Sequence, residues 1–154
     1  MISGNHFRRL DRRSLLKAAV AASVAQVASP FVFSARAEDN VKIGLDNPLT
    51  GTYAALGQNE QIGAQLAVDQ INAQGGILGR KVDLLVEDST SGDAATAVQK
   101  ATKLVERDKV SFLLGNVNSA LAQAIANYAF EKSILHVVPG GHVDTVTGSQ
   151  CHWN

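Results

Sequence analysis

The chain has 154 residues, of which 14 are basic and 14 acidic, so its formal net charge is zero. The charges are unevenly spread: six basic residues and one acidic residue lie within residues 1–37, which leaves 8 basic and 13 acidic residues for 38–154. An acidic segment without a basic cluster argues against nucleic-acid binding, because phosphate binding depends on lysine and arginine. The single cysteine, Cys151, excludes a disulfide within the chain.

Residues 1–37 have the layout of an export signal. A basic start is followed by an apolar run at 18–27, and Ala35-Arg36-Ala37 places small residues before a cleavage site. The run of about ten residues is too short to span a membrane as a helix. Because Arg12-Arg13-Ser14-Leu15-Leu16-Lys17 resembles the twin-arginine motif, we predict twin-arginine export to the periplasm, with 38–154 as the mature part. The alternative is an ordinary amphipathic or disordered tail.

Strand and helix patterns alternate after the signal. Short apolar runs predict strands at 41–45, 81–86, 110–114 and 134–138. Helices of about fifteen residues between such strands imply right-handed crossovers and a parallel sheet covered on both faces. The predicted fold class is therefore doubly wound α/β, in which ligands bind outside the carboxyl ends of the strands.

Three helices are expected between these strands. The first runs from Asn59 to Gln74, after a loop at 46–58, and its apolar face contains Ile62, Leu66, Val68 and Ile71. The second starts after Asp93, whose carboxylate is a typical N-cap, and ends near Asp108. The third begins at Asn118-Ser119.

The loops after the strands hold the candidate ligand contacts. A helix start at Asn118 and Ser119 presents amides and a hydroxyl suited to a carboxylate, although Ser119 is equally expected as a plain N-cap. Gly140 and Gly141 let a ligand approach the backbone, and His142 adds an imidazole, with an ordinary exposed histidine as the alternative. In the first loop, Tyr53 suits either a ligand wall or a surface turn.

Signs of catalysis are missing from the sequence. Glu87, Asp88 and Asp93 are interpreted as solvated loop charges, and the four histidines have no metal-site spacing. No nucleophile elbow, phosphate loop or zinc motif occurs. The residues alone therefore give no positive evidence for catalysis, and no metal or other cofactor is expected.

Several stretches together resemble a known family. The chain resembles periplasmic binding proteins of the leucine/isoleucine/valine type at Pro48-Leu49-Thr50-Gly51 and Ala54-Ala55-Leu56-Gly57. The most specific match is 69–80, which contains Asn72-Ala73-Gln74-Gly75-Gly76-Ile77-Leu78-Gly79-Arg80. Such proteins serve ABC uptake transporters, and the resemblance implies two α/β lobes that close on a ligand and deliver it to a membrane permease.

The resemblance also implies roles for individual residues. Ser119 would hold the carboxylate of the ligand, helped by amides of the following turn, and Gly140 would offer a carbonyl to its ammonium group. His142 stands where the family often has a threonine or serine, and Leu56 where a tyrosine sometimes lines the side-chain pocket. The expected ligand is an amino acid of the branched-chain type, or a related small amide or carboxylate.

Members of that family are more than twice as long as this chain. We therefore expect 38–154 to be the amino-terminal part of the first lobe, truncated before any hinge. Two other functions stay open at this point: an exported α/β enzyme, and a ligand-sensing receptor domain of the same fold.

Overall fold

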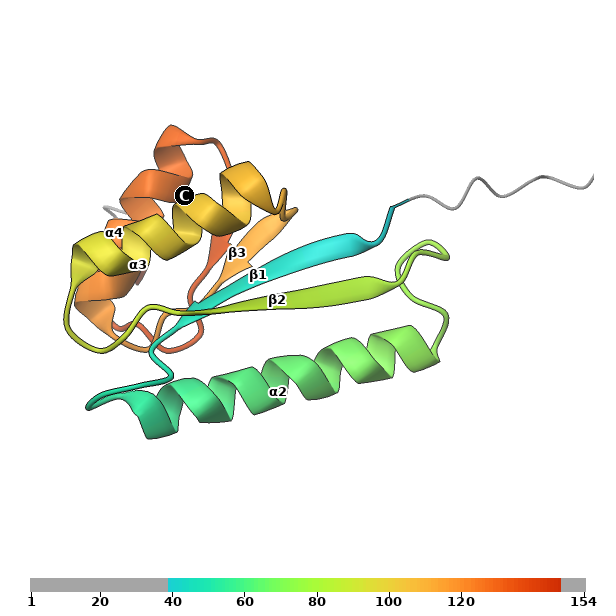
Figure 1. Ribbon diagram of the computed structural model, residues 1–154, viewed down its shortest axis with the longest axis horizontal. Helices are drawn as coiled ribbons and strands as arrows, with labels where there is room; N and C mark the ends of the chain where they lie inside the picture. The colour runs from blue at the N-terminus through green and yellow to red at the C-terminus, as the bar shows by residue number, and fades with distance from the viewer. Residues whose placement is uncertain (1–38, 148–154) are drawn as a thin grey trace, which may run out of the picture. The chain divides into compact units, whose positions relative to one another are not determined.

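The computed structural model describes residues 39–147 (Figure 1). The predicted signal segment and Cys151 therefore lie outside the described residues. In chain order the elements are β1 (Val41–Asn47), α2 (Ala54–Ala73), β2 (Val82–Asp88), α3 (Ala94–Thr102), the π-helical turn η1 (Lys103–Arg107), β3 (Phe112–Leu114), α4 (Ser119–Glu131), β4 (His136–Val137) and α5 (Asp144–Thr147).

The four strands form one parallel sheet in the order β2-β1-β3-β4. β1 pairs with β2 from Val41↔Val82 to Asn47↔Asp88, and with β3 from Ile43↔Phe112 onward. Helix α2 lies on one face of the sheet, and α3 and α4 lie on the other (Figure 1). The predicted doubly wound α/β architecture and all four predicted strands are confirmed, although β3 and β4 are shorter than expected.

Each face of the sheet has its own apolar core. On the α3 and α4 face, small alanines of α3 let Leu104, Leu113 and Ile125 pack closely, and all three side chains are almost fully buried. On the α2 face, Val68 packs against Ile43 and Val82. Apolar side chains on alternate strand positions thus enter opposite cores, as a sheet covered on both faces requires.

The predicted start of the first helix is wrong by five residues. Helix α2 begins at Ala54, so the loop after β1 is shorter than 46–58. Ala54, Ala55 and Leu56 are strong helix formers, and the chain is held at this point because the backbone N–H of Tyr53 donates to Ser91 Oγ at 3.0 Å. Gly57, which we had placed in the loop, is instead buried inside the helix.

The predicted apolar face of this helix is also partly wrong. Val68 and Ile71 pack on the sheet, but Ile62 and Leu66 are 67% and 57% exposed. Val68 lies on the face that meets the sheet, whereas Leu66, two positions before it, points about 200° away around the helix.

No helix within residues 39–147 has the length and apolar character needed to cross a membrane.

Two glycines of α2 give a matched test of the packing between this helix and the loop after β1. A Cβ on Gly57 would lie 2.1 Å from the carbonyl oxygen of Pro48, whereas a Cβ on Gly63 would meet nothing within 4 Å. We expect Gly57→Ala to lower the free energy of unfolding by about 1–3 kcal/mol through overpacking. Gly63→Ala should raise it by about 0.5–1 kcal/mol, because alanine favours the helix. Urea unfolding followed by circular dichroism measures both, and equal effects would contradict the close contact at Pro48.

Candidate functional site

A pocket of about 410 Å³ opens at the carboxyl edge of the sheet. Its walls come from the first turns of α2, the connection after β3 and the connection after β4. The lining residues are Leu56, Asn59, Glu60, Val117, Gly140 and His142. Three of the residues singled out from the sequence, Leu56, Gly140 and His142, therefore share one pocket.

Ser119 lies directly beside this pocket. It is the first residue of α4, and its Oγ accepts a hydrogen bond of 3.1 Å from the backbone N–H of His142. The bond ties the start of α4 to the connection after β4. The structure thus places Ser119 and His142 together at the same edge of the sheet.

Asn118 caps α4 and does not line the pocket. Its Oδ1 accepts from the backbone N–H groups of Ala120 and Leu121, and its Nδ2 donates to the carbonyl of Ser91. The expectation of unpaired amides at this helix start is therefore wrong for Ala120 and Leu121, because the side chain of Asn118 already occupies them. The N-cap residue of α4 is Asn118 and not Ser119.

Gly141 and Tyr53 do not line the pocket either. Gly141 is buried, and a Cβ there would meet Val138 and Ala122, so this residue packs toward α4. Tyr53 precedes α2 and is 39% exposed. The sequence did not distinguish these two positions from the residues that line the pocket, because the orientation of a loop residue depends on contacts with residues far away in the sequence.

Two pocket residues, Asn59 and Glu60, were missed, as was a buried asparagine that organises the pocket. Asn47 Nδ2 donates to Glu60 Oε2 at 2.6 Å, and Asn47 Oδ1 accepts from the N–H of Val117 at 3.2 Å. Asn47 is fully buried. A polar residue ending a buried strand was the available signal for Asn47.

A second buried asparagine, Asn116, joins the strand ends. Asn116 Nδ2 donates to Ser89 Oγ at 2.7 Å and to the carbonyl of Asp46 at 3.3 Å, while its Oδ1 accepts from the N–H of Asn118 at 2.9 Å. The ends of β1, β2 and β3 are thereby linked through one side chain.

The three acidic residues interpreted as solvated charges have structural roles. Glu87 is buried and forms ion pairs with Lys100 and Lys103 of the neighbouring helical segment, so that interpretation is wrong for it. Asp88 accepts from the N–H of Leu49 and the hydroxyl of Thr50, which fixes the loop after β1. Asp93 caps α3, as predicted.

Two titratable groups near the strand ends, the buried Asp46 and the half-buried His136, have unusual pKa values. Neither carboxylate oxygen of Asp46 has a hydrogen-bond partner in the described part of the chain, and burial raises its pKa to about 7 despite the nearby Ser89 hydroxyl and Lys100 ammonium. Burial lowers the pKa of His136 to about 4, although its Nε2 contacts the carbonyl of Gly115.

These two groups should give opposite pH dependences of stability. Asp46 binds a proton more tightly in the folded state, so its contribution falls as the pH rises from about 4 to about 7. His136 binds a proton less tightly when folded, so its contribution falls as the pH drops from about 6.5 to about 4. The two slopes should largely cancel over the interval they share.

The variant Asp46→Asn should therefore expose the His136 slope. We expect it to be more stable than the wild type at about pH 8, by up to about 4 kcal/mol, and to lose stability on acidification below about pH 6.5. Thermal or urea unfolding across this pH range measures the effect, with Asp69→Asn on the exposed side of α2 as the control. Parallel pH profiles for wild type and Asp46→Asn would rule out an ionisable Asp46 in the core.

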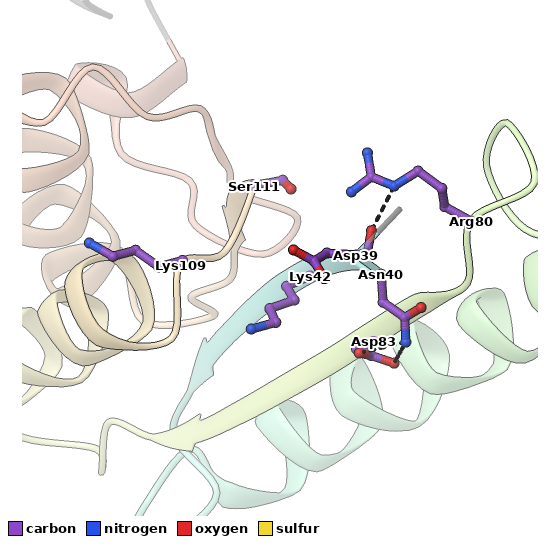
Figure 2. Close-up of a pocket in the computed structure, with 7 residues that line it drawn as sticks. All are labelled: Asp39, Asn40, Lys42, Arg80, Asp83, Lys109 and Ser111. Carbon is purple, nitrogen blue, oxygen red and sulfur yellow. Dashed lines mark hydrogen bonds between the residues drawn. The ribbon is translucent and has the colours of Figure 1, made fainter. Parts of the chain in front are cut away.

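A second pocket, of about 620 Å³, lies at the opposite edge, near the amino ends of the strands (Figure 2). It is lined by Asp39, Asn40, Lys42, Arg80, Asp83, Lys109 and Ser111. Several of its polar groups are satisfied within the protein: Asn40 Nδ2 donates to Asp83, and Arg80 Nε donates to the carbonyl of Asp39 (Figure 2). Because ligands of doubly wound sheets bind at the carboxyl edge, the candidate site is the pocket beside Ser119.

Within residues 39–147, no three histidine, cysteine, aspartate or glutamate side chains are grouped so that they could hold a metal ion.

The chain is similar to proteins that bind small solutes. The model of the family described as "Periplasmic binding protein" matches residues 40–154. The Leu/Ile/Val-binding protein BraC3 of Rhizobium johnstonii is 40% identical over 124 residues, which cover 80% of this chain and 32% of that protein.

Solved structures agree in fold. LivJ of Streptococcus pneumoniae, a branched-chain amino acid transporter substrate-binding protein in complex with isoleucine, superposes with a TM-score of 0.67 at 37% identity, covering 71% of this chain and 31% of LivJ. A solute-binding protein of an ABC transporter from R. palustris, in complex with benzoate, gives 0.62 at 34% identity, covering 73% and 30%.

The chain belongs to the periplasmic binding protein family. This confirms the resemblance seen in the sequence. The chain spans about a third of the length of the curated relatives it matches.

Proposed function

We propose that the chain forms part of the periplasmic substrate-binding component of an ABC uptake transporter, which binds an amino acid or a related small amide or carboxylate. The observation that carries this proposal is the pocket at the carboxyl edge of the sheet, where Leu56, Gly140 and His142 meet beside Ser119. Relatives named for leucine, isoleucine and valine, and the neighbour that holds isoleucine, support the ligand class.

Ser119 and His142 suggest how the ligand carboxylate is held. Because Ser119 Oγ accepts from the His142 backbone, the hydroxyl hydrogen can be donated to a carboxylate in the pocket. Gly140 brings bare backbone to the pocket wall, where its carbonyl can accept from a ligand ammonium. The protein performs no chemistry: ligand binding favours a closed arrangement of two lobes, which a membrane permease then recognises.

The role of Ser119 can be tested in a hybrid protein. Residues 40–147 would replace the matching segment of the Rhizobium relative, which is 40% identical to this chain. Ser119→Ala in the hybrid should weaken leucine binding by about 1–3 kcal/mol, because a buried charged group loses one hydrogen-bond partner. Isothermal titration calorimetry measures this change. Ser111→Ala, at the opposite edge of the sheet, is the control and should leave affinity unchanged (Figure 2).

An unchanged leucine affinity in Ser119→Ala would remove Ser119 from the ligand site. A loss of the same size in Ser111→Ala would show that the hybrid responds to general destabilisation rather than to a lost ligand contact.

We also propose that export to the periplasm uses the twin-arginine route, on the basis of Arg12-Arg13 and the residues that follow. Replacing both arginines with lysine should block export, so that uncleaved precursor accumulates in the cytoplasm. Cell fractionation and immunoblotting measure the processed fraction. Normal processing of the lysine variant in a strain that lacks the twin-arginine translocase would assign export to the general secretory route.

A further inference from the structure

Glu60 places a carboxylate in the candidate pocket. It lies on the first turns of α2 and is half-buried, and among the described residues that line this pocket it is the one with a carboxylate. Its Oε2 accepts a hydrogen bond of 2.6 Å from Asn47 Nδ2. Because Asn47 is fully buried at the end of β1 and also bonded to Val117, it fixes the position of the Glu60 carboxylate.

The second oxygen of Glu60 points toward Gly140. A Cβ built on Gly140 would lie 2.6 Å from Glu60 Oε1 and 3.1 Å from Val117 Cα. A larger residue at this position would therefore displace the carboxylate or close the space beside it. Glycine keeps Oε1 accessible at the wall between α2 and the connection after β4.

Within residues 39–147, the charge of Glu60 has no cationic partner in the protein. The ion pairs of this part of the chain involve Glu87, Glu106 and Asp108, and the pocket lining contains no lysine or arginine. Burial raises the pKa of Glu60, although the hydrogen bond from Asn47 lowers it. A half-buried carboxylate without a counter-charge is costly, and a cation entering the pocket would offset that cost.

We propose that Glu60 binds the cationic group of the ligand, an alkylammonium, so that the pocket selects ammonium-bearing ligands over simple carboxylates such as aromatic acids. This inference rests on the proposed function, since it assumes that the pocket beside Ser119 is the ligand site. It narrows the ligand class to compounds with a positively charged nitrogen near their carboxylate.

The test uses the chain itself, labelled with ¹⁵N, and three small probes of similar size: propylammonium, propionate and propanol. Propylammonium should shift the backbone amides of Val117, Gly140 and His142 in a saturable manner. Glu60→Gln should weaken its apparent affinity about tenfold, which corresponds to about 1.4 kcal/mol. The glutamine keeps an oxygen that can accept from Asn47, so the variant removes charge rather than the hydrogen bond. Glu131→Gln, exposed at the end of α4, is the matched control and should bind propylammonium as the wild type does.

A second variant separates charge from access. Gly140→Ala retains the carboxylate but places a methyl group against Glu60 Oε1, so it should also weaken propylammonium binding. Equal shifts with propanol, undiminished affinity in Glu60→Gln, or the absence of any shift with propylammonium would each overturn the assignment.

The two proposals fail in different ways. If propionate shifts the amides of Ser119 and Ala120 while propylammonium shifts nothing, the carboxylate site stands and the role of Glu60 is wrong. If propylammonium binds through Glu60 while Ser119→Ala leaves leucine affinity unchanged in the hybrid, the cation site stands and the carboxylate site is wrong.

Discussion

The buried amide of Asn47 fixes the walls of the candidate pocket relative to one another. It ends β1 and reaches Glu60 on α2 with its nitrogen and the backbone of Val117 with its oxygen. A buried amide must have partners for both groups, since each unmade hydrogen bond costs about 1–3 kcal/mol. The start of α2 and the connection after β3 are thus held at the end of β1 because both groups of the Asn47 amide need hydrogen-bond partners. These two segments form walls of the pocket.

Polar groups gather at the carboxyl edge of the sheet at a cost in stability. The cores on both faces are apolar, yet the buried Asp46 and the half-buried His136 lie near the strand ends with buried polar atoms that find no partner in the described residues. Burial raises the pKa of Asp46 and lowers the pKa of His136. Titratable side chains that an apolar core would exclude are therefore present where the sheet meets the candidate site. Because Asp46 and His136 titrate in opposite senses, the free energy of unfolding depends less on pH than it would with either group alone.

The sequence predicted the fold better than the site because the two depend on different interactions. Strand runs such as 41–45 and the N-cap Asp93 are local signals, and both were confirmed. The start of α2 was missed because the loop was extended to residue 58, whereas Gly57 lies inside the helix, where its lack of a Cβ allows close contact with Pro48. Ile62 and Leu66 match helical spacing but lie off the face that meets the sheet, which spacing alone does not reveal.

By itself, the sequence determined the order of strands and helices and the parallel sheet, and its motifs resembled the family to which the chain belongs. Apolar periodicity and short connections are enough for the fold, because they restrict which faces can be buried. Only the tertiary structure decided which residues at the carboxyl edge of the sheet line the pocket. Leu56, Glu60 and His142 do, whereas Tyr53, Asn118 and Gly141 do not. The reason is that hydrogen bonds between separate segments, such as those from Asn47 to Glu60 and from His142 to Ser119, set side-chain direction in connections that have no periodicity of their own.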